Sequence, residues 1–207
     1  MMIDNVVLLT GQTEGPYLAE TLRFRHDGLN VLVVHDAVSL ANAVAELLDA
    51  HRLFRLIAFS TDIIVPAEII ETLPTVGYNF HAGPPEHPGS LPACFAVYEG
   101  ADVFGVTVHE LAKEVDCGAI VAVRRFPIPD DLTATDLMGR AYQVLAGLFS
   151  DMVKDMVDQS DPLPVIGEKW CMPVRRRIDA AALVDTPDGM EAGEAERRRR
   201  AFGHLAR

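Results

Sequence analysis

The sequence has few cysteines and no long apolar run. Its three cysteines, Cys94, Cys117 and Cys171, are odd in number and sparse across 207 residues. This count argues against a disulfide scaffold and is typical of a reduced, cytoplasmic setting. No apolar run approaches the roughly 18 residues that span a bilayer, so we expect no membrane segment. No basic segment precedes the first apolar run, so we expect no secretory signal.

Basic residues are also scarce. The chain has 18 Lys and Arg against 30 Asp and Glu, which gives a formal net charge of −12. Residues 161–207 hold nine bases and eight acids, so residues 1–160 carry a net charge of −13. Nucleic-acid binding depends on clustered Lys and Arg, so we do not expect a nucleic-acid partner. The change in composition predicts a domain over residues 1–160 and a short C-terminal extension over 161–207.

Apolar residues, by contrast, are plentiful. They make up 49% of the chain and charged residues 23%, a balance that provides a core and excludes disorder as the main state. Short apolar runs alternate with helix-like segments. The runs predict strands at 6–9, 31–34, 56–59, 75–80, 104–108 and 119–123. This alternation predicts an α/β domain with a central, mostly parallel sheet flanked by helices.

Three segments carry signals for the start of a helix. Pro16 can begin a helix because the first turn needs no N–H from it. Ser39 is the expected cap of a helix over 40–50, whose apolar residues lie along one stripe. Thr133 and Asp136 have the spacing of a capping box and open a long amphipathic helix.

The loop after the predicted strand 75–80 is the most informative part of the chain. Asn79 and His81 stand two residues apart at the strand end, so their side chains point to the same side. The loop 82–89 that follows contains three prolines and two glycines, which restrict its backbone. A polar pair beside a rigid loop at the carboxyl end of a strand is typical of a preorganised binding site. The alternative is an ordinary turn in which Asn79 and His81 satisfy backbone groups.

A second polar loop follows the predicted strand 104–108. Asp116 stands two residues before Gly118, where the absence of a side chain could let a ligand approach the backbone. The same pattern is common in ordinary turns. Cys117, between them, is interpreted as a small packing residue.

Taken together, the two loops resemble the folate-dependent formyltransferase family. The resemblance rests on Asn-x-His at 79–81, Gly-Val-Thr at 105–107 and Asp-x-Gly at 116–118. It runs from about residue 58 to 127 and more loosely from 1 to 158. The family includes methionyl-tRNA, glycinamide ribonucleotide and amino-sugar N-formyltransferases, and it implies a Rossmann-like formyltransferase fold. The chain departs from the best-known members at Ala82, where they often have proline.

The resemblance also implies a mechanism. The formyl donor would be 10-formyltetrahydrofolate, and the acceptor a small-molecule amine such as a nucleotide-linked amino sugar. Acyl transfer needs donors aimed at an oxyanion and groups that move protons. By resemblance, Asn79 would bind the oxyanion, His81 would stabilise it and transfer protons, and Asp116 would orient His81.

Further residues are assigned by position relative to these three. Residues implied to contact the folate come from the neighbouring loops: Ser60, Thr61, Asp62, Ile63, Val65, Glu110 and Val115. Three more are expected to support the site or the substrate. Thr107 would hydrogen-bond to the catalytic residues, Gly83 belongs to the rigid loop, and His87 would lie near the substrate entrance. The chemistry needs no metal, and His81, His87 and His109 lack the spacing of a metal site.

Several functions remain open at this point. A methionyl-tRNA formyltransferase would share the catalytic residues, and a formyltetrahydrofolate hydrolase would use water as the acceptor. A folate-binding module without activity is a further alternative. The arginines at 197–200 are interpreted as the solvated face of a final helix rather than a nucleic-acid patch. The sequence leaves three alternatives for residues 161–207: they complete the acceptor pocket, they build a homodimer interface, or they do neither.

Overall fold

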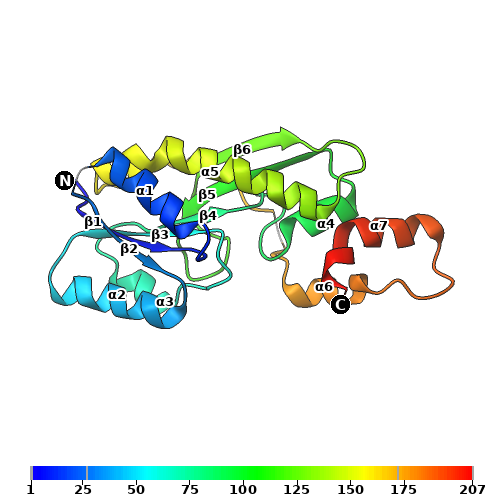
Figure 1. Cartoon of the computed structure of the whole chain (residues 1–207), viewed down its shortest axis with the longest axis horizontal. Coiled ribbons are helices and arrows are strands. Elements are labelled where there is room, and N and C mark those ends of the chain that lie inside the picture. Colours follow the sequence, from blue (N-terminus) through cyan, green and yellow to red (C-terminus); the bar gives the residue numbers. More distant parts are fainter. Residues whose placement is uncertain (1, 27, 172, 207) are drawn as a thin grey trace. The chain divides into compact units, whose positions relative to one another are not determined.

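The chain folds around a six-stranded mixed sheet with helices on its faces (Figure 1). The computed structural model describes residues 2–26, 28–171 and 173–206. The strands lie in the order β2-β1-β3-β4-β5-β6. Their bounds are β1 (Asn5–Leu9), β2 (Asn30–Val34), β3 (Phe54–Phe59), β4 (Tyr78–His81), β5 (Val103–Glu110) and β6 (Ile120–Pro127). The helices are α1 (Gly15–Arg25), α2 (Ala37–Asp49), α3 (Ala67–Thr72), α4 (Pro92–Glu99), α5 (Ala134–Asp158), α6 (Arg177–Val184) and α7 (Ala192–Phe202).

The first four strands form the parallel part of the sheet. β1 pairs in parallel with β2 and β3, and β3 pairs in parallel with β4. All residues of β1 and β3 are buried, which is expected for strands covered on both faces. The predicted α/β class with a mostly parallel sheet is therefore confirmed.

The last two strands reverse direction. The Leu111 N–H donates to the carbonyl of Gly77 at 2.8 Å, so the end of β5 lies beside the start of β4. The Glu110 N–H donates to Ala119 O at 2.9 Å, and the Ile128 N–H donates to Asp102 O at 2.8 Å. These bonds join opposite ends of the paired segments and therefore make β5 antiparallel to both β4 and β6.

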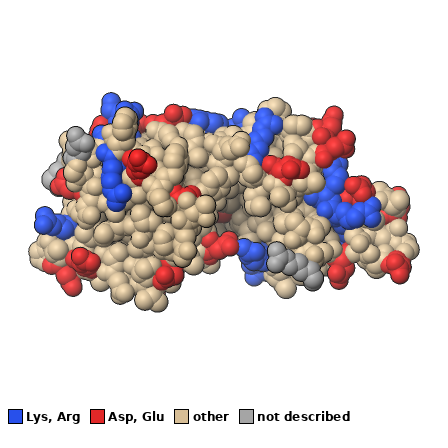
Figure 2. All heavy atoms as spheres, viewed as in Figure 1, with Lys and Arg blue, Asp and Glu red and all other residues tan. Residues whose placement is uncertain are grey.

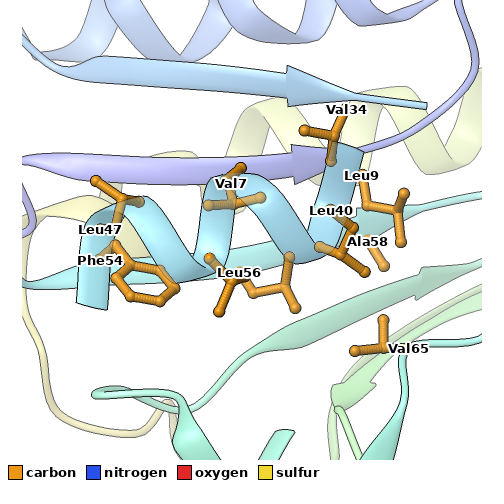
Figure 3. Packing of buried hydrophobic residues seen from close by; sticks show 11 residues of the cluster. Val7, Leu9, Val34, Leu40, Leu47, Phe54, Leu56, Ala58 and Val65 are labelled. Atoms are coloured by element: carbon orange, nitrogen blue, oxygen red, sulfur yellow. The ribbon is translucent and has the colours of Figure 1, made fainter. Parts of the chain in front are cut away.

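Apolar residues fill both faces of the parallel sheet. On one face, Leu40 and Leu47 of α2 pack on Val7, Leu9 and side chains of β3 (Figure 3). On the other face, Phe149 of α5 contacts the rings of Phe59 and Phe80, with centroids 5.6 and 5.1 Å away. This packing fixes the carboxyl ends of β3 and β4, where polar side chains follow.

The helix starts agree with two of the three sequence predictions. Pro16 lies in the first turn of α1, and Thr133 exchanges hydrogen bonds with Asp136 at the start of α5. The predicted cap of α2 is wrong. Asp36 is the cap, because its carboxylate accepts the N–H groups of Val38 and Ser39, and Ser39 instead closes the capping box.

The chain forms two compact units. Unit 1 comprises Met1–His81, Val108–Ala122 and Ala146–Gly167, and unit 2 comprises Ala82–Thr107, Val123–Leu145 and Glu168–Arg207. In unit 2, α4, α6 and α7 enclose a cluster that includes Phe95, Ala180 and Phe202. The final helix expected from the sequence is present as α7. The division at residue 160 remains a prediction.

None of the helices in the described part of the chain combines the length and the apolar character that crossing a bilayer requires.

Candidate functional site

Four polar side chains of unit 1 converge at one end of the sheet. Asn79 and His81 come from β4, His109 comes from β5, and Asp116 comes from the loop between β5 and β6. Asn79 and His81 lie on the same side of β4 because strand side chains alternate. The antiparallel pairing of β4 and β5 brings His109 opposite Asn79, and their side-chain nitrogens are 3.0 Å apart.

Asp116 is the centre of this cluster. Its Oδ2 lies 3.3 Å from His81 Nδ1, and its Oδ1 lies 3.2 Å from His109 Nε2. The Asp116 and His109 side chains are each 3% exposed, and that of His81 is 10% exposed. Sequence reasoning therefore identified three members that the structure brings together.

The loop that carries Asp116 has two unusual backbone positions, Asp116 itself and Gly118. Asp116 has a φ of 47°, in the left-handed region, which Asp tolerates better than most residues. At Gly118, a Cβ would lie 1.8 Å from Glu110 O and 3.2 Å from His109 Nδ1. The close approach predicted at Gly118 is thus made by the protein's own strand rather than by a ligand. Gly118 lets the loop fold back on β5 and carry Asp116 to the two histidines.

The contact with Asp116 defines the tautomer of the His81 ring. An ionised carboxylate only accepts hydrogen bonds, so His81 Nδ1 carries the proton that it shares with Asp116. In the neutral ring, Nε2 is then the acceptor nitrogen. A carboxylate that fixes an imidazole in this tautomer is the arrangement that general-base catalysis uses.

A comparison with known families agrees with this geometry. The family model described as Formyl transferase matches residues 6–152, more than two thirds of the chain. The chain belongs to the formyl transferase family. The resemblance drawn from the sequence motifs is confirmed.

The curated relatives match this chain over only part of their own length. Methionyl-tRNA formyltransferases of Streptococcus pneumoniae are 30% identical over 92 residues, which are 44% of this chain and 28% of the relative. The match therefore spans less than a third of these relatives.

Solved structures match along nearly the whole chain. A sugar N-formyltransferase from Shewanella sp has a TM-score of 0.74 at 19% identity, and the match covers 94% of this chain and 85% of that one. The N-formyltransferase from Helicobacter canadensis, in complex with folinic acid and dTDP-3-aminofucose, has a TM-score of 0.66 at 18% identity. That match covers 97% of this chain and 81% of the other. The formyltransferase fold is thereby confirmed.

The residues expected to contact folate lie in two loops of unit 1. After β3, Ser60 is exposed with a φ of 43°, and its N–H donates to Phe80 O at 3.0 Å. Thr61 accepts the N–H of Ile63 through its hydroxyl, and Asp62 is exposed. Ile63 and Val65 pack against the apolar cluster beneath the loop. Their role in folate binding remains a prediction.

The second expected folate loop follows β5. Both main-chain groups of Glu110 bond within the protein, the N–H to Ala119 and the carbonyl to His109 Nδ1. The N–H of Glu110 therefore already donates a hydrogen bond within the protein. Val115 is 42% exposed and stands next to Asp116.

The three supporting residues belong to unit 2. The expectation that the Thr107 hydroxyl bonds to the catalytic residues is wrong, because it donates to Gly83 O at 2.8 Å. This bond ties the start of the rigid loop to β5. His87 is buried, with Nδ1 3.8 Å from Glu99 of α4. Burial lowers the pKa of His87, while the nearby Glu99 and Glu86 carboxylates oppose that shift.

His109 is the member of the cluster that sequence reasoning missed as a functional residue. In the sequence it stands two residues after Thr107 and among the three histidines weighed as metal ligands, and no catalytic role follows for it there. The missing information was the direction of β5, because an antiparallel neighbour places His109 beside Asn79. Among residues 2–26, 28–171 and 173–206, no group of three His, Cys, Asp or Glu side chains is arranged to hold a metal ion.

The cysteines differ in environment. Cys117 is exposed, so its interpretation as a packing residue is wrong. The loop turns its side chain outward while burying Asp116 beside it. Cys94 is buried among α4 and α7, and burial raises the pKa of its thiol to about 11.

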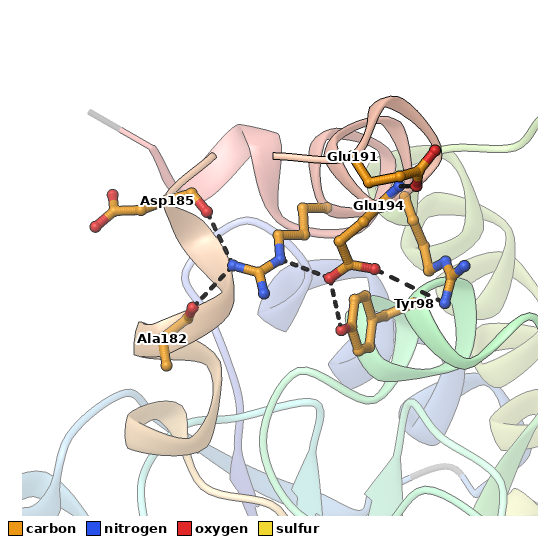
Figure 4. A network of polar contacts seen from close by, with 7 residues as sticks. Tyr98, Ala182, Asp185, Glu191 and Glu194 are labelled. Atoms are coloured by element: carbon orange, nitrogen blue, oxygen red, sulfur yellow. Dashed lines mark hydrogen bonds and ion pairs between the residues drawn. The ribbon is translucent and has the colours of Figure 1, made fainter. Parts of the chain in front are cut away.

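Charges of both signs are interspersed on the face shown in Figure 2. In α7, Arg198 bonds to Glu194 and to the carbonyls of Ala182 and Asp185 (Figure 4). The neighbouring arginines also have acidic partners: Arg197 pairs with Glu194, Arg199 with Glu196 and Arg200 with Asp131. The arginine run is thus an ion-paired helix surface.

Proposed function

We propose that this protein transfers the formyl group of 10-formyltetrahydrofolate to the amine of a small molecule, specifically a nucleotide-linked amino sugar. The observation that carries the proposal is the buried Asp116, which holds His81 through Nδ1 beside Asn79. Membership of the formyl transferase family supports the choice of donor.

The proposed chemistry assigns a step to each side chain. The amine nitrogen attacks the formyl carbon, and the carbonyl oxygen becomes an oxyanion. Asn79 Nδ2 has two N–H groups. One faces His109 Nε2, which leaves the second for the oxyanion. His81 Nε2 takes the proton of the attacking amine, and Asp116 stabilises the resulting imidazolium. The bond from the formyl carbon to the folate nitrogen then breaks, and His81 returns the proton to that nitrogen.

The choice of acceptor rests on charge and on the sugar enzymes among the structural neighbours. These neighbours include a sugar N-formyltransferase and an N-formyltransferase in complex with dTDP-3-aminofucose. A methionyl-tRNA formyltransferase from Clostridium thermocellum also matches 96% of this chain, so the extent of the match does not separate the two acceptors. Residues 1–160 carry a net charge of −13, which repels a polyanion such as tRNA.

The test is an acceptor panel with 10-formyltetrahydrofolate, following release of tetrahydrofolate. The panel contains a nucleotide-linked amino sugar, the unlinked amino sugar, methionyl-tRNA, and buffer without amine. We expect turnover with the nucleotide-linked sugar. Turnover with methionyl-tRNA alone, or formate release without amine, would instead identify a tRNA formyltransferase or a hydrolase. Folate binding in calorimetry without any turnover would identify a binding module.

Two substitutions test the assigned roles. We expect Asn79→Ala to lower kcat by about 10²–10³-fold, the cost of one oxyanion donor. His81→Gln should lower it by about 10²–10⁴-fold, since no general base remains. His51→Gln, an exposed histidine after α2, is the matched control and should retain full activity. Equal activity of His81→Gln and wild type would refute the mechanism.

A further inference from the structure

The proline-rich loop 82–89 has a limited capacity to hydrogen-bond with itself. Three of its residues are prolines, which have no N–H, so the loop has fewer donors than carbonyls. Within the loop, the His87 N–H donates to Pro84 O at 3.0 Å. The carbonyls of Pro85 and Pro88 accept hydrogen bonds from residues outside the loop. A distant part of the chain therefore helps to define the loop conformation.

That part is a C-terminal segment, residues 168–171 and 173–175, which we call the strap. The strap and the loop both belong to unit 2. Main-chain hydrogen bonds join them in both directions. They run from Cys171 N–H to Pro85 O at 2.9 Å, from Arg175 N–H to Pro88 O at 2.9 Å and from Ser90 N–H to Arg175 O at 2.8 Å. The strap thus supplies the donors that the prolines of the loop lack.

Charged side chains hold both ends of the strap. At its start, Glu168 accepts two hydrogen bonds from Arg125 of β6, at 2.7 and 2.9 Å. The same guanidinium donates to Glu86 of the loop at 2.7 Å. At the end of the strap, Arg175 donates to Glu99 of α4 at 2.8 Å. The strap is therefore tied to β6 and to α4 on either side of its main-chain bonds to the loop.

The contact between loop and strap requires an unusual backbone. Gly89 pairs with Arg175 like a residue in a parallel strand, and its φ of 92° suits glycine. A Cβ at this position would overlap Arg175 O and would lie 2.8 Å from Arg175 N. Two residues later, Leu91 has a φ of 59°, which is costly for a leucine and persists only where surrounding contacts impose it. Such strained positions cluster at segments that bind ligands.

We infer that the strap is a positioning element that holds loop 82–89 in the conformation that contacts the acceptor. It thereby sets the affinity for the acceptor without taking part in the chemistry. This inference rests on the proposed function. The loop begins one residue after His81, the proposed base for the acceptor amine, so it follows the reacting group directly in the chain. The residues expected to contact folate lie in loops of unit 1, which leaves this loop to the acceptor.

The decisive variant is Gly89→Ala, because its Cβ forces the strap away from the loop. If the loop then adopts its binding conformation about one tenth of the time, the KM for the acceptor rises about tenfold while kcat stays within about twofold. The KM for 10-formyltetrahydrofolate should not change. Steady-state kinetics measure this split. The acceptor probe is dTDP-3-aminofucose, which the H. canadensis enzyme binds, together with any other amine of the panel that wild type formylates.

Two further variants separate this role from a general loss of structure. Gly100→Ala is the matched control: Gly100 also lies in unit 2 with a φ of 71°, but no atom lies within 4 Å of its ideal Cβ. It carries the backbone strain without the overlap and should keep the wild-type KM. Glu168→Ala removes one side-chain tie of the strap and should raise the acceptor KM by less than about fivefold, because a half-exposed ion pair contributes little.

Amide hydrogen exchange, followed by NMR, tests the strap without any substrate. The amides of Ser90 and Arg175 should exchange faster in Gly89→Ala than in wild type or Gly100→Ala. Unchanged exchange, equal KM values in the two glycine variants, or a loss of kcat with an unchanged acceptor KM would overturn the inference. If wild type formylates no amine of the panel, the proposed function fails and the acceptor role of the strap fails with it. The exchange rates still decide whether the strap holds the loop.

Discussion

The two compact units of this protein are stabilised in different ways. In unit 1, α2 packs on the sheet through an apolar cluster, and the fully buried Arg55 of β3 donates to the carbonyls of Met156 and Ser160. In unit 2, arginines connect segments that are distant in sequence. Arg125 of β6 bonds to both Glu86 and Glu168, and Arg175 bonds to Glu99 while its guanidinium lies 4.9 Å from the Phe95 ring centroid.

This difference has a consequence for function. Close apolar packing restricts side chains and backbone, so it can hold the polar groups of Asn79, His81, His109 and Asp116 at fixed positions. Half-exposed ion pairs contribute little each and are screened by salt. We therefore expect unit 2 to depend on its few buried apolar contacts, and the chemistry to depend on backbone geometry in unit 1.

The largest effect should follow from Phe202→Ala in unit 2. Phe202 is fully buried, and its ring packs 5.7 Å from the rings of Phe95 and Tyr98. Truncating a buried phenylalanine costs about 3–5 kcal/mol. The single tryptophan, Trp170, belongs to unit 2, so its fluorescence in urea reports on this unit. We expect its unfolding midpoint to fall sharply.

Phe24→Ala is the matched control for this prediction. Phe24 lies on α1 of unit 1 and is 89% exposed, so its truncation should leave the free energy of unfolding nearly unchanged. Far-UV circular dichroism follows both units. If Phe202→Ala shifts the tryptophan and dichroism transitions together, the two units unfold as one, and the expected difference in what stabilises them is wrong.

The next effect concerns the backbone of the site. Gly118→Ala places a Cβ 1.8 Å from Glu110 O, so the loop that carries Asp116 must shift. A displacement of about 1 Å at a reacting group can cost about 10²-fold in rate, and we expect a loss in kcat of at least this size. Steady-state kinetics with the formyl donor measure it.

A second glycine provides the comparison. Gly139 lies on α5 with no atom within 4 Å of its ideal Cβ, and alanine there should stabilise the helix by about 0.5–1 kcal/mol. Gly139→Ala should keep full activity. Wild-type kcat in Gly118→Ala would mean that the contact between this loop and β5 does not set the position of Asp116.

Much of unit 1 could be predicted from local sequence. Its strands are apolar runs, and Asn79 and His81 at one strand end and Asp116 in a later loop match a family pattern. His109 could not be recognised in this way, because its role depends on the antiparallel pairing of β5 with β4. The predicted cap, Ser39, is wrong because Asp36 suits that position equally well, and only the backbone shows which of the two begins the helix.

Unit 2 was harder to predict for a physical reason. Residues 93–98 form a short apolar run that fits a strand or a helix equally well, and they lie in α4. α6 has only eight residues, and its single buried residue is Ala180. Such helices are stabilised by tertiary packing against Phe202 and its neighbours rather than by their own periodicity.

A smaller effect should follow from Arg125→Lys. The Arg125 guanidinium donates to both oxygens of Glu168 and to Glu86, so it connects β6 with the rigid loop and the C-terminal residues. Lysine keeps the charge but not the bidentate geometry. Arg125 is one third exposed, so we expect a loss in stability below about 1 kcal/mol that diminishes at high salt.

The control for this network is Arg199→Lys. Arg199 pairs only across one turn of α7 with Glu196, and both side chains are exposed. Its substitution should give no measurable change in the tryptophan unfolding midpoint. Equal effects of the two substitutions would show that the Arg125 network contributes no more than an ordinary surface pair.

The smallest effect concerns the pH dependence of unit 2. Burial lowers the pKa of His87 below the value of about 6.5 that it has in the unfolded chain. Below about pH 6.5, the unfolded chain therefore binds more protons at this residue than the folded chain does. Proton binding to the unfolded state lowers stability, so His87 should make unit 2 less stable as the pH falls.

His87→Gln removes this proton difference. Between about pH 7.5 and 5.5, the variant should lose less stability than the wild type, as measured by Trp170 fluorescence in urea. His204→Gln, an exposed histidine in the same unit, should follow the wild-type pH dependence. Identical slopes for His87→Gln and wild type would mean that Glu99 and Glu86 offset the burial of His87 completely, so that the polar contacts of unit 2 are stronger than those of an ordinary surface.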